Sequence, residues 1–308
     1  MNRFSITLLL LLSIFLSSQA NAAMQTFVSI PPQKWLVDRV GGNLVNTSIL
    51  AGKGQDPHTF EPAPQTMRRL ASASLWFTLD MEFERQLTKR IRQTAPKLRI
   101  VDTTSGITKL LMARHEDVHH HDEHGDDHHE HDSNHESTHV RHGHAKGQDP
   151  HVWLSPENLI VMATTVEQAL AEADPANSTS YERNRKQVEE KLTQLHQDLA
   201  RMLASHKGAS FYVFHPSFGY FAHAYGLEQH AVEVEGKTPS PRQLSRLISK
   251  AKEEGVKVIF VQPQFDTHSG QVIAKAIHGE VVHLDSLAED VAANLRLIAE
   301  RINSALSP

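Results

Sequence analysis

The chain has 308 residues, of which 39% are hydrophobic and 22% are charged, and its formal net charge is −5 with histidine counted as neutral. This length allows one large domain or two smaller ones, and the apolar content excludes a wholly disordered chain. The charge gives no basic surface of the kind that nucleic-acid-binding proteins carry, so nucleic acid is not expected as a partner. Because there is no cysteine, disulfides, thiolate metal sites and cysteine catalysis are excluded.

Residues 1–22 have the pattern of a secretory signal peptide. Arg3 supplies the positive start, and residues 8–16 form an apolar run much shorter than the ~20 residues that span a bilayer. The Ala-Asn-Ala sequence at 20–22 offers a small-residue cleavage site. The pattern predicts export to the periplasm, with a membrane anchor as the alternative. N-terminal lipidation is excluded because no cysteine follows the apolar run.

The next part of the chain alternates between strand and helix patterns. Runs of β-branched and aromatic residues predict strands, and apolar residues at helical spacing predict helices. Strands are predicted at 26–30, 45–50, 75–79 and 99–102, with helices at 33–40, 64–73 and 83–94. Such alternation is typical of parallel strands joined by crossover helices.

Residues 115–144 interrupt the alternation. This segment holds 12 of the 22 histidines of the chain together with nine aspartates and glutamates. It has too little apolar surface to offset the entropy lost on ordering, so we expect a mobile loop.

Order is predicted to resume at 149–154. Ser155-Pro156, a capping hydroxyl followed by proline, then begins a helix that runs to about residue 173. A second helix at 175–206 would be about 45 Å long. The alternation then returns, with strands at 211–214, 230–234, 256–262 and 281–284 and helices at 218–225, 241–254, 270–278 and 288–305.

The predicted fold class is therefore α/β, with two lobes that each contain a roughly four-stranded parallel sheet with flanking helices. One long helix bridges them. The expected division is a signal peptide at 1–22, a first lobe at 23–174 that includes the His-rich loop, a linking helix at 175–206 and a second lobe at 207–308.

Three of the ten histidines outside the His-rich loop share a setting. His58 and His151 each follow an Asp-Pro pair, and His215 follows a predicted strand. Asp285 follows the last predicted strand, and open α/β sheets bind ligands at the carboxyl ends of their strands. Three imidazoles and one carboxylate suit Zn²⁺, whereas Mg²⁺ and Ca²⁺ prefer oxygen ligands. The spacing alone does not constitute a metal motif, and each histidine taken singly could equally be an ordinary capping or hydrogen-bonded residue.

Six short motifs give the chain a family resemblance. They are Ile-Pro-Pro-Gln at 30–33, Asp-Pro-His-Thr-Phe-Glu-Pro at 56–62, Asp-Pro-His-Val-Trp-Leu at 149–154, Phe-His-Pro-Ser-Phe-Gly-Tyr at 214–220, Pro-Ser-Pro at 239–241 and Pro-Gln-Phe at 263–265. With these motifs, essentially the whole chain after residue 22 resembles the cluster A-I metal-binding components of bacterial ABC transporters, in particular the zinc-binding members. That family has two α/β lobes bridged by a long helix, with the metal between the lobes.

The resemblance implies metal ligands at His58 and His151 from the first lobe and at His215 from the second. Asp285 matches a position where some members use aspartate, while other zinc members complete the shell with water or another carboxylate. Manganese-binding relatives usually have glutamate where this chain has His215, so histidine there favours zinc. Two departures are Gln262, where many relatives have glutamate, and the lack of a disulfide that some relatives have in the second lobe.

The function implied by the resemblance is high-affinity zinc capture in the periplasm and delivery to a membrane permease and its ATPase. Zn²⁺ would be the transported ligand of a monomeric protein that is not an enzyme. A zinc-dependent hydrolase with a three-histidine site is an alternative, although the chain has no His-Glu-x-x-His motif. Another alternative is a periplasmic zinc buffer or chaperone that acts through residues 115–144. That loop could collect zinc, sense its excess, or be only a spacer.

Overall fold

The computed structural model describes residues 22–112, 147–233, 239–265 and 268–307. The predicted signal peptide, apart from its last residue, and the predicted His-rich loop lie outside these ranges. Among the described residues, no helix has the length and apolar character needed to cross a membrane.

The first sheet is formed by four parallel strands in the order β2-β1-β3-β4. The strands are β1 (Met24–Val28), β2 (Val45–Ile49), β3 (Leu75–Thr78) and β4 (Arg99–Asp102), and the helices are α2 (Pro31–Gly41), α3 (Pro64–Ala71) and α4 (Glu82–Thr94). A 3₁₀ turn, η1 (Gly42–Leu44), connects α2 to β2. The strand order changes direction between β1 and β3, and open α/β sheets bind ligands outside the carboxyl ends of strands at such a point.

The second sheet repeats this arrangement, with four parallel strands in the order β6-β5-β7-β8. It contains β5 (Ser210–Val213), β6 (Glu228–Ala231), β7 (Val258–Val261) and β8 (Glu280–His283), with helices α7 (Gly219–Tyr225), α8 (Pro241–Glu253), α9 (His268–Ala276) and α10 (Val291–Leu306). Its order reverses between β5 and β7, so each sheet has one such reversal point.

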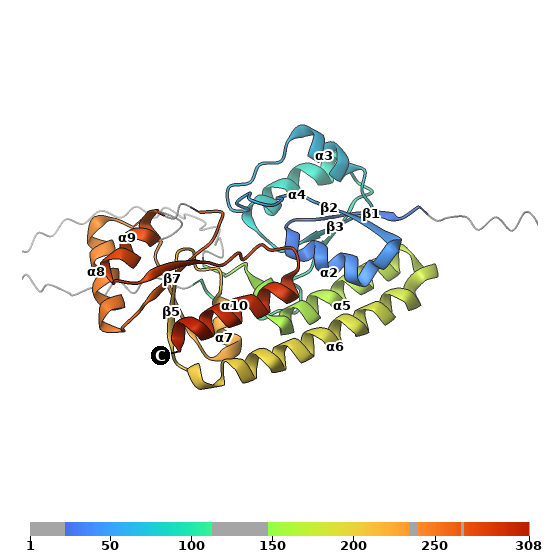
Figure 1. Cartoon of the computed structure of the whole chain (residues 1–308). Helices are drawn as coiled ribbons and strands as arrows, with labels where there is room; N and C mark the ends of the chain where they lie inside the picture. Colours follow the sequence, from blue (N-terminus) through green and yellow to red (C-terminus); the bar gives the residue numbers. More distant parts are fainter. Residues whose placement is uncertain (1–21, 113–146, 234–238, 266–267, 308) are drawn as a thin grey trace, which may run out of the picture.

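One long helix links the two halves of the chain, and the helix before it packs on the first half. The connecting segment consists of η2 (Val152–Leu154), α5 (Pro156–Ala173), η3 (Pro175–Asn177), α6 (Ser178–Met202) and η4 (Ala204–His206). Ser155 caps α5 by accepting a hydrogen bond from the Asn158 amide, as its sequence predicted. Helix α6 packs against α2 and α5 of the first half and against α10 of the second (Figure 1). The predicted fold class is confirmed.

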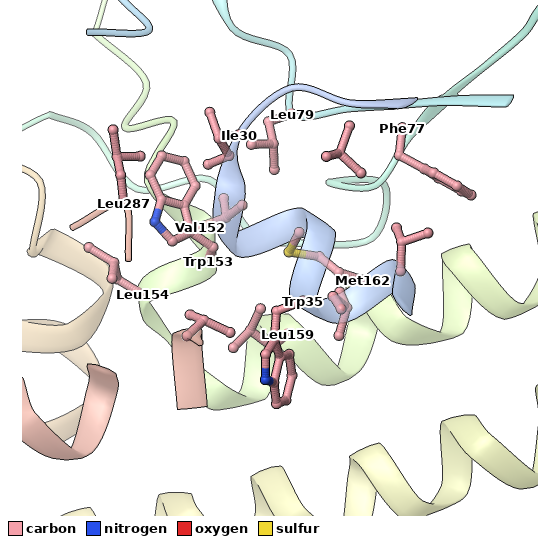
Figure 2. Close-up of a cluster of buried hydrophobic side chains, with 14 of the residues drawn as sticks. Ile30, Trp35, Phe77, Leu79, Val152, Trp153, Leu154, Leu159, Met162 and Leu287 are labelled. Atoms are coloured by element: carbon pink, nitrogen blue, oxygen red, sulfur yellow. The ribbon is translucent and has the colours of Figure 1, made fainter. Parts of the chain in front are cut away.

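The apolar core between the first sheet and α5 supports the segment that carries His151. Trp153 is fully buried and lies with Ile30, Leu79 and Leu287 in one cluster (Figure 2). The indole nitrogen of Trp153 donates to the carbonyl of Ser286, at 2.7 Å. Because Ser286 and Leu287 follow β8, this cluster ties the second sheet to the first at the level of the candidate site.

A few predicted boundaries are wrong. The strand predicted at 230–234 is β6 and ends at Ala231, and the strand predicted at 256–262 is limited to Val258–Val261. The helix predicted to start at 288 begins at Val291, because the Asp290 side chain caps it by accepting from the Ala293 amide. The helix predicted over 175–206 is continuous α-helix only over α6, with a 3₁₀ turn at each end.

Candidate metal centre

The structure brings together the three histidines singled out by the sequence. His58 lies in the loop after β2, His215 lies just after β5, and His151 directly precedes η2. Each offers one ring nitrogen, and these three atoms lie within 4.8 Å of one another. The two Nε2 atoms of His151 and His215 are 3.3 Å apart. Residues from both sheets and from the segment between them therefore converge at one point.

Carboxylates hold two of the imidazole rings from behind. Nδ1 of His151 lies 2.6 Å from Oδ1 of Asp149, and Nδ1 of His215 lies 2.7 Å from Oε1 of Glu233. A carboxylate can only accept, so each ring donates from Nδ1 and presents the lone pair of Nε2. This is the arrangement that orients histidine ligands in metal proteins and raises their basicity.

The backbone around the rings is also fixed by side chains. Gln262, which is fully buried after β7, accepts from the His215 amide at 3.1 Å and donates to the His215 carbonyl at 2.6 Å. The amides of His58 and His151 each donate, at 2.9 Å, to the aspartate two residues earlier, Asp56 and Asp149. The Asp-Pro-His triplet is thus a local turn that aims the histidine.

Burial differs among the three imidazoles. His151 and His215 are 3% and 6% exposed, whereas His58 is the exposed member at the mouth of the site. Burial lowers the pKa of His215, and the hydrogen bond that the ring donates to Glu233 opposes this only in part. The pKa of His58 is also lowered. The main cause is that surrounding protein atoms desolvate the ring, and the second is electrostatic repulsion from the nearby His215. Both effects keep these rings neutral and able to bind a metal.

One distance in the site equals the edge of a zinc tetrahedron. With Zn–N bonds of about 2.0–2.1 Å, two ligand nitrogens on one tetrahedral edge are about 3.3–3.4 Å apart. The Nε2 atoms of His151 and His215 show this separation, at 3.3 Å. The three histidines line a cavity of about 10 Å³, which is close to the space that one water molecule needs. The space beside the rings is therefore about the size of one water molecule.

Asp285, the predicted fourth ligand, lies two residues after β8. Its Oδ1 accepts hydrogen bonds from Nε2 of Gln264, at 2.8 Å, and from the Leu287 amide, at 2.9 Å. It does not belong to the group of donor atoms that lie within 4.8 Å of one another. Its predicted role as fourth ligand stays a prediction.

Three supporting residues were not identified from the sequence as parts of the site. Asp149 could have been recognised, because it stands in the same Asp-Pro-His triplet as His151. Glu233 gave no local signal, because it is 18 residues from His215 and reaches it only through the pairing of β5 and β6. Phe265 stacks on the His215 ring with centroids 4.5 Å apart.

A family model described as the zinc-uptake complex component A, periplasmic, matches residues 27–302. The chain belongs to this family. Members of this family are periplasmic metal-binding components of transporters, and the family is not a known class of enzyme. The resemblance drawn from the sequence motifs is thereby confirmed.

Two named relatives are each less than 30% identical to this chain in sequence. The zinc-binding protein AdcA of Streptococcus pyogenes serotype M3 is 27% identical over 276 residues, which is 86% of this chain but 52% of AdcA. The chain therefore spans about half the length of these first relatives. The high-affinity zinc uptake system protein ZnuA of Yersinia pestis is 26% identical, with 88% of this chain and 85% of that protein covered.

Solved structures agree in fold. A crystal structure of ZnuA is 35% identical with a TM-score of 0.80, and the match covers 92% of this chain and all of that one. A zinc-bound deletion mutant of ZnuA matches equally well, with a TM-score of 0.80 and 35% identity. A laminin-binding adhesin of Streptococcus agalactiae has a TM-score of 0.75 at 21% identity, which shows the shared fold alone.

Neutralising the supporting carboxylates tests the orientation of the rings. We expect Asp149→Asn and Glu233→Gln each to weaken Zn²⁺ affinity about 10-fold, because each ring keeps an acceptor but loses the charge that makes it basic. Glu228 is an exposed glutamate of β6. Glu228→Gln is therefore the matched control and should bind Zn²⁺ as tightly as the unaltered protein does. Competition with a chromophoric chelator measures all three. Equal affinities for all three variants would show that the carboxylates do not act on the metal.

The lowered pKa values give a pH dependence of known sign. A protonated imidazole cannot bind zinc. Because the pKa values of His58 and His215 are lowered, both rings stay neutral at pH values below the ordinary pKa of histidine. The protein without residues 115–144 should therefore keep its affinity to a lower pH than a free peptide of residues 115–144, whose histidines titrate near 6.5. Chelator competition between pH 5 and 8 measures both. Parallel losses of affinity would contradict the electrostatics of the site.

Proposed function

We propose that this protein captures Zn²⁺ in the periplasm and delivers it to the permease and ATPase of an ABC transporter. The observation that carries the proposal is the convergence of three imidazole nitrogens within 4.8 Å of one another, two of which are separated by the edge length of a zinc tetrahedron. The names of its relatives support zinc as the cargo, since they include a zinc-binding protein and a zinc uptake protein. Zn²⁺ is then a transported ligand and not a catalytic cofactor.

The proposed ligands are His58, His151 and His215, and the fourth ligand is Asp285 or a water molecule. Three nitrogen donors and no sulfur favour zinc over softer metals, and the neutral donors distinguish the site from the oxygen sites of Mg²⁺ and Ca²⁺. Imidazole sites follow the general order of divalent affinities, so Ni²⁺, Co²⁺ and Cu²⁺ are expected to bind in vitro as well.

Capture and release would use the two halves as lobes. The proposed lobes are residues 23–174, including the His-rich loop at 115–144, and residues 207–308, joined by the linking helix at 175–206. Helix α6 contacts helices of both halves, so it restricts how far they can separate. Docking on the transporter would pull His215 away from His58 and His151, and the loss of one ligand would release the ion. The protein would act as a monomer, after removal of a signal peptide at 1–22.

Two rival functions are less well supported. A zinc hydrolase needs an open position for substrate and a free general base beside the metal-bound water. The carboxylates nearest the rings, Asp149 and Glu233, are engaged by His151 and His215, and the cavity of about 10 Å³ leaves no room for a substrate. A zinc buffer acting through residues 115–144 would not need the three converging histidines. We therefore propose that this loop is auxiliary.

The test is a chelator-competed Zn²⁺ titration of the protein that lacks residues 1–22 and 115–144. We expect one tight site, and we expect His215→Ala to weaken it by at least 100-fold, because one of three protein donors is lost. His223→Ala, which changes an exposed histidine of α7, is the control and should keep full affinity. A loop-deleted protein without a tight site would place zinc capture in the loop and refute the assignment of the three histidines.

A further inference from the structure

The side-chain orientation of Gln264 is fixed by a hydrogen bond from its amide nitrogen. It follows β7, and its Nε2 donates to Oδ1 of Asp285 at 2.8 Å. Because a carboxylate accepts and does not donate, the amide nitrogen must face Asp285. The same Asp285 oxygen accepts from the Leu287 amide at 2.9 Å, so the carboxylate is itself held by the backbone. The amide oxygen of Gln264 is therefore directed away from Asp285.

That oxygen lacks a hydrogen-bond partner among the described residues. Oε1 of Gln264 has less than 1 Å² of accessible surface and accepts no hydrogen bond there. One other buried side-chain atom in the described part of the chain shares this property, Nε1 of Trp35, which lies on α2. Gln264 differs because it lines the cavity formed by His58, His151 and His215. Unpartnered buried acceptors are rare and point to a donor that the protein itself does not supply.

The chemistry of the cavity limits what that donor can be. The walls contribute imidazole lone pairs, and the space of about 10 Å³ fits a species no larger than water beside an ion. A zinc-bound water is a strong donor, because the metal polarises its O–H bonds. It would satisfy the Gln264 oxygen and complete four-coordination with three histidines.

We propose that Gln264 is a positioning residue, which accepts a hydrogen bond from a water molecule bound to zinc as its fourth ligand. Asp285 then acts through Gln264 and does not bind the metal directly. This inference rests on the proposed function, since it requires zinc at the three histidines. It assigns a role to a residue outside the expected ligand set and makes the fourth ligand one that exchanges with solvent. An exchangeable ligand lets zinc enter and leave with only three protein bonds to form or break.

The first experiment compares variants by Zn²⁺ affinity. Gln264→Leu removes the acceptor at similar volume and should weaken binding about 10-fold. Gln264→Glu keeps an acceptor at this position and should bind more tightly than Gln264→Leu. Asp285→Asn keeps an oxygen that can accept from Gln264, so its loss should be no larger than that of Gln264→Leu. Gln194→Leu, at an exposed position of α6, is the control and should leave affinity unchanged.

The second experiment uses Co²⁺ in place of Zn²⁺ and reads the visible d–d spectrum of the full protein without its signal peptide. Fluoride, a single-atom anion of about the size of water, should replace the bound water and shift the d–d spectrum of the wild-type protein. This measurement does not depend on the folding of any variant. An unchanged spectrum together with a loss of 100-fold or more in Asp285→Asn would make Asp285 the direct ligand and overturn the inference. Wild-type affinity in Gln264→Leu would also overturn it. Loss of binding in His151→Ala would still uphold the proposed function in either case, whereas unchanged binding there would refute the function itself.

Discussion

The site depends on the 3.3 Å separation between the Nε2 atoms of His151 and His215. Both rings donate from Nδ1 to a carboxylate, so two lone pairs face each other inside the protein. That contact is unfavourable unless a positive charge lies between them. A proton could supply the charge, but burial lowers the pKa of His215 and disfavours it. A divalent cation satisfies both nitrogens at once, and the exposed His58 adds a third donor where the ion would enter.

Each side of this contact is supplied by a different part of the fold. His215 and Gln262 follow β5 and β7, between which the strand order of the second sheet reverses. Parallel strands end at the same edge, so these side chains lie together without any special sequence between them. His151 is instead fixed from the core, where Trp153 is buried among residues of the first sheet and bonded to Ser286. The site thus exists only while the two sheets are held at this relative position.

Much of the fold was predictable because local signals agreed with the tertiary structure. The strands around Trp76 and Phe260 are apolar, as buried parallel strands must be, and Ser155 and Pro156 mark the helix start. The triplets before His58 and His151 could be recognised as preorganised turns. The boundaries that were predicted wrongly depend on a capping contact, as at Asp290, or on strand pairing. The apolar pattern along the chain does not specify such contacts.

The metal site was predictable in its ligand candidates but not in its supporting contacts. Residues as far apart as His58, His151 and His215 meet only because the sheets are parallel and the halves are packed together. The partner of His215, Glu233, lies two residues after the neighbouring strand β6. The orientation of Gln264 follows from its bond to Asp285. Such side-chain pairs depend on tertiary distances, which spacing along the chain does not report.

The most direct test is a crystal structure of the zinc-loaded protein, with anomalous diffraction measured on both sides of the zinc absorption edge. The account predicts one strong anomalous peak in the described part of the chain, about 2.0–2.1 Å from a nitrogen of each of His58, His151 and His215. A peak bonded to fewer than these three rings, or no ordered zinc between the two sheets, would contradict it.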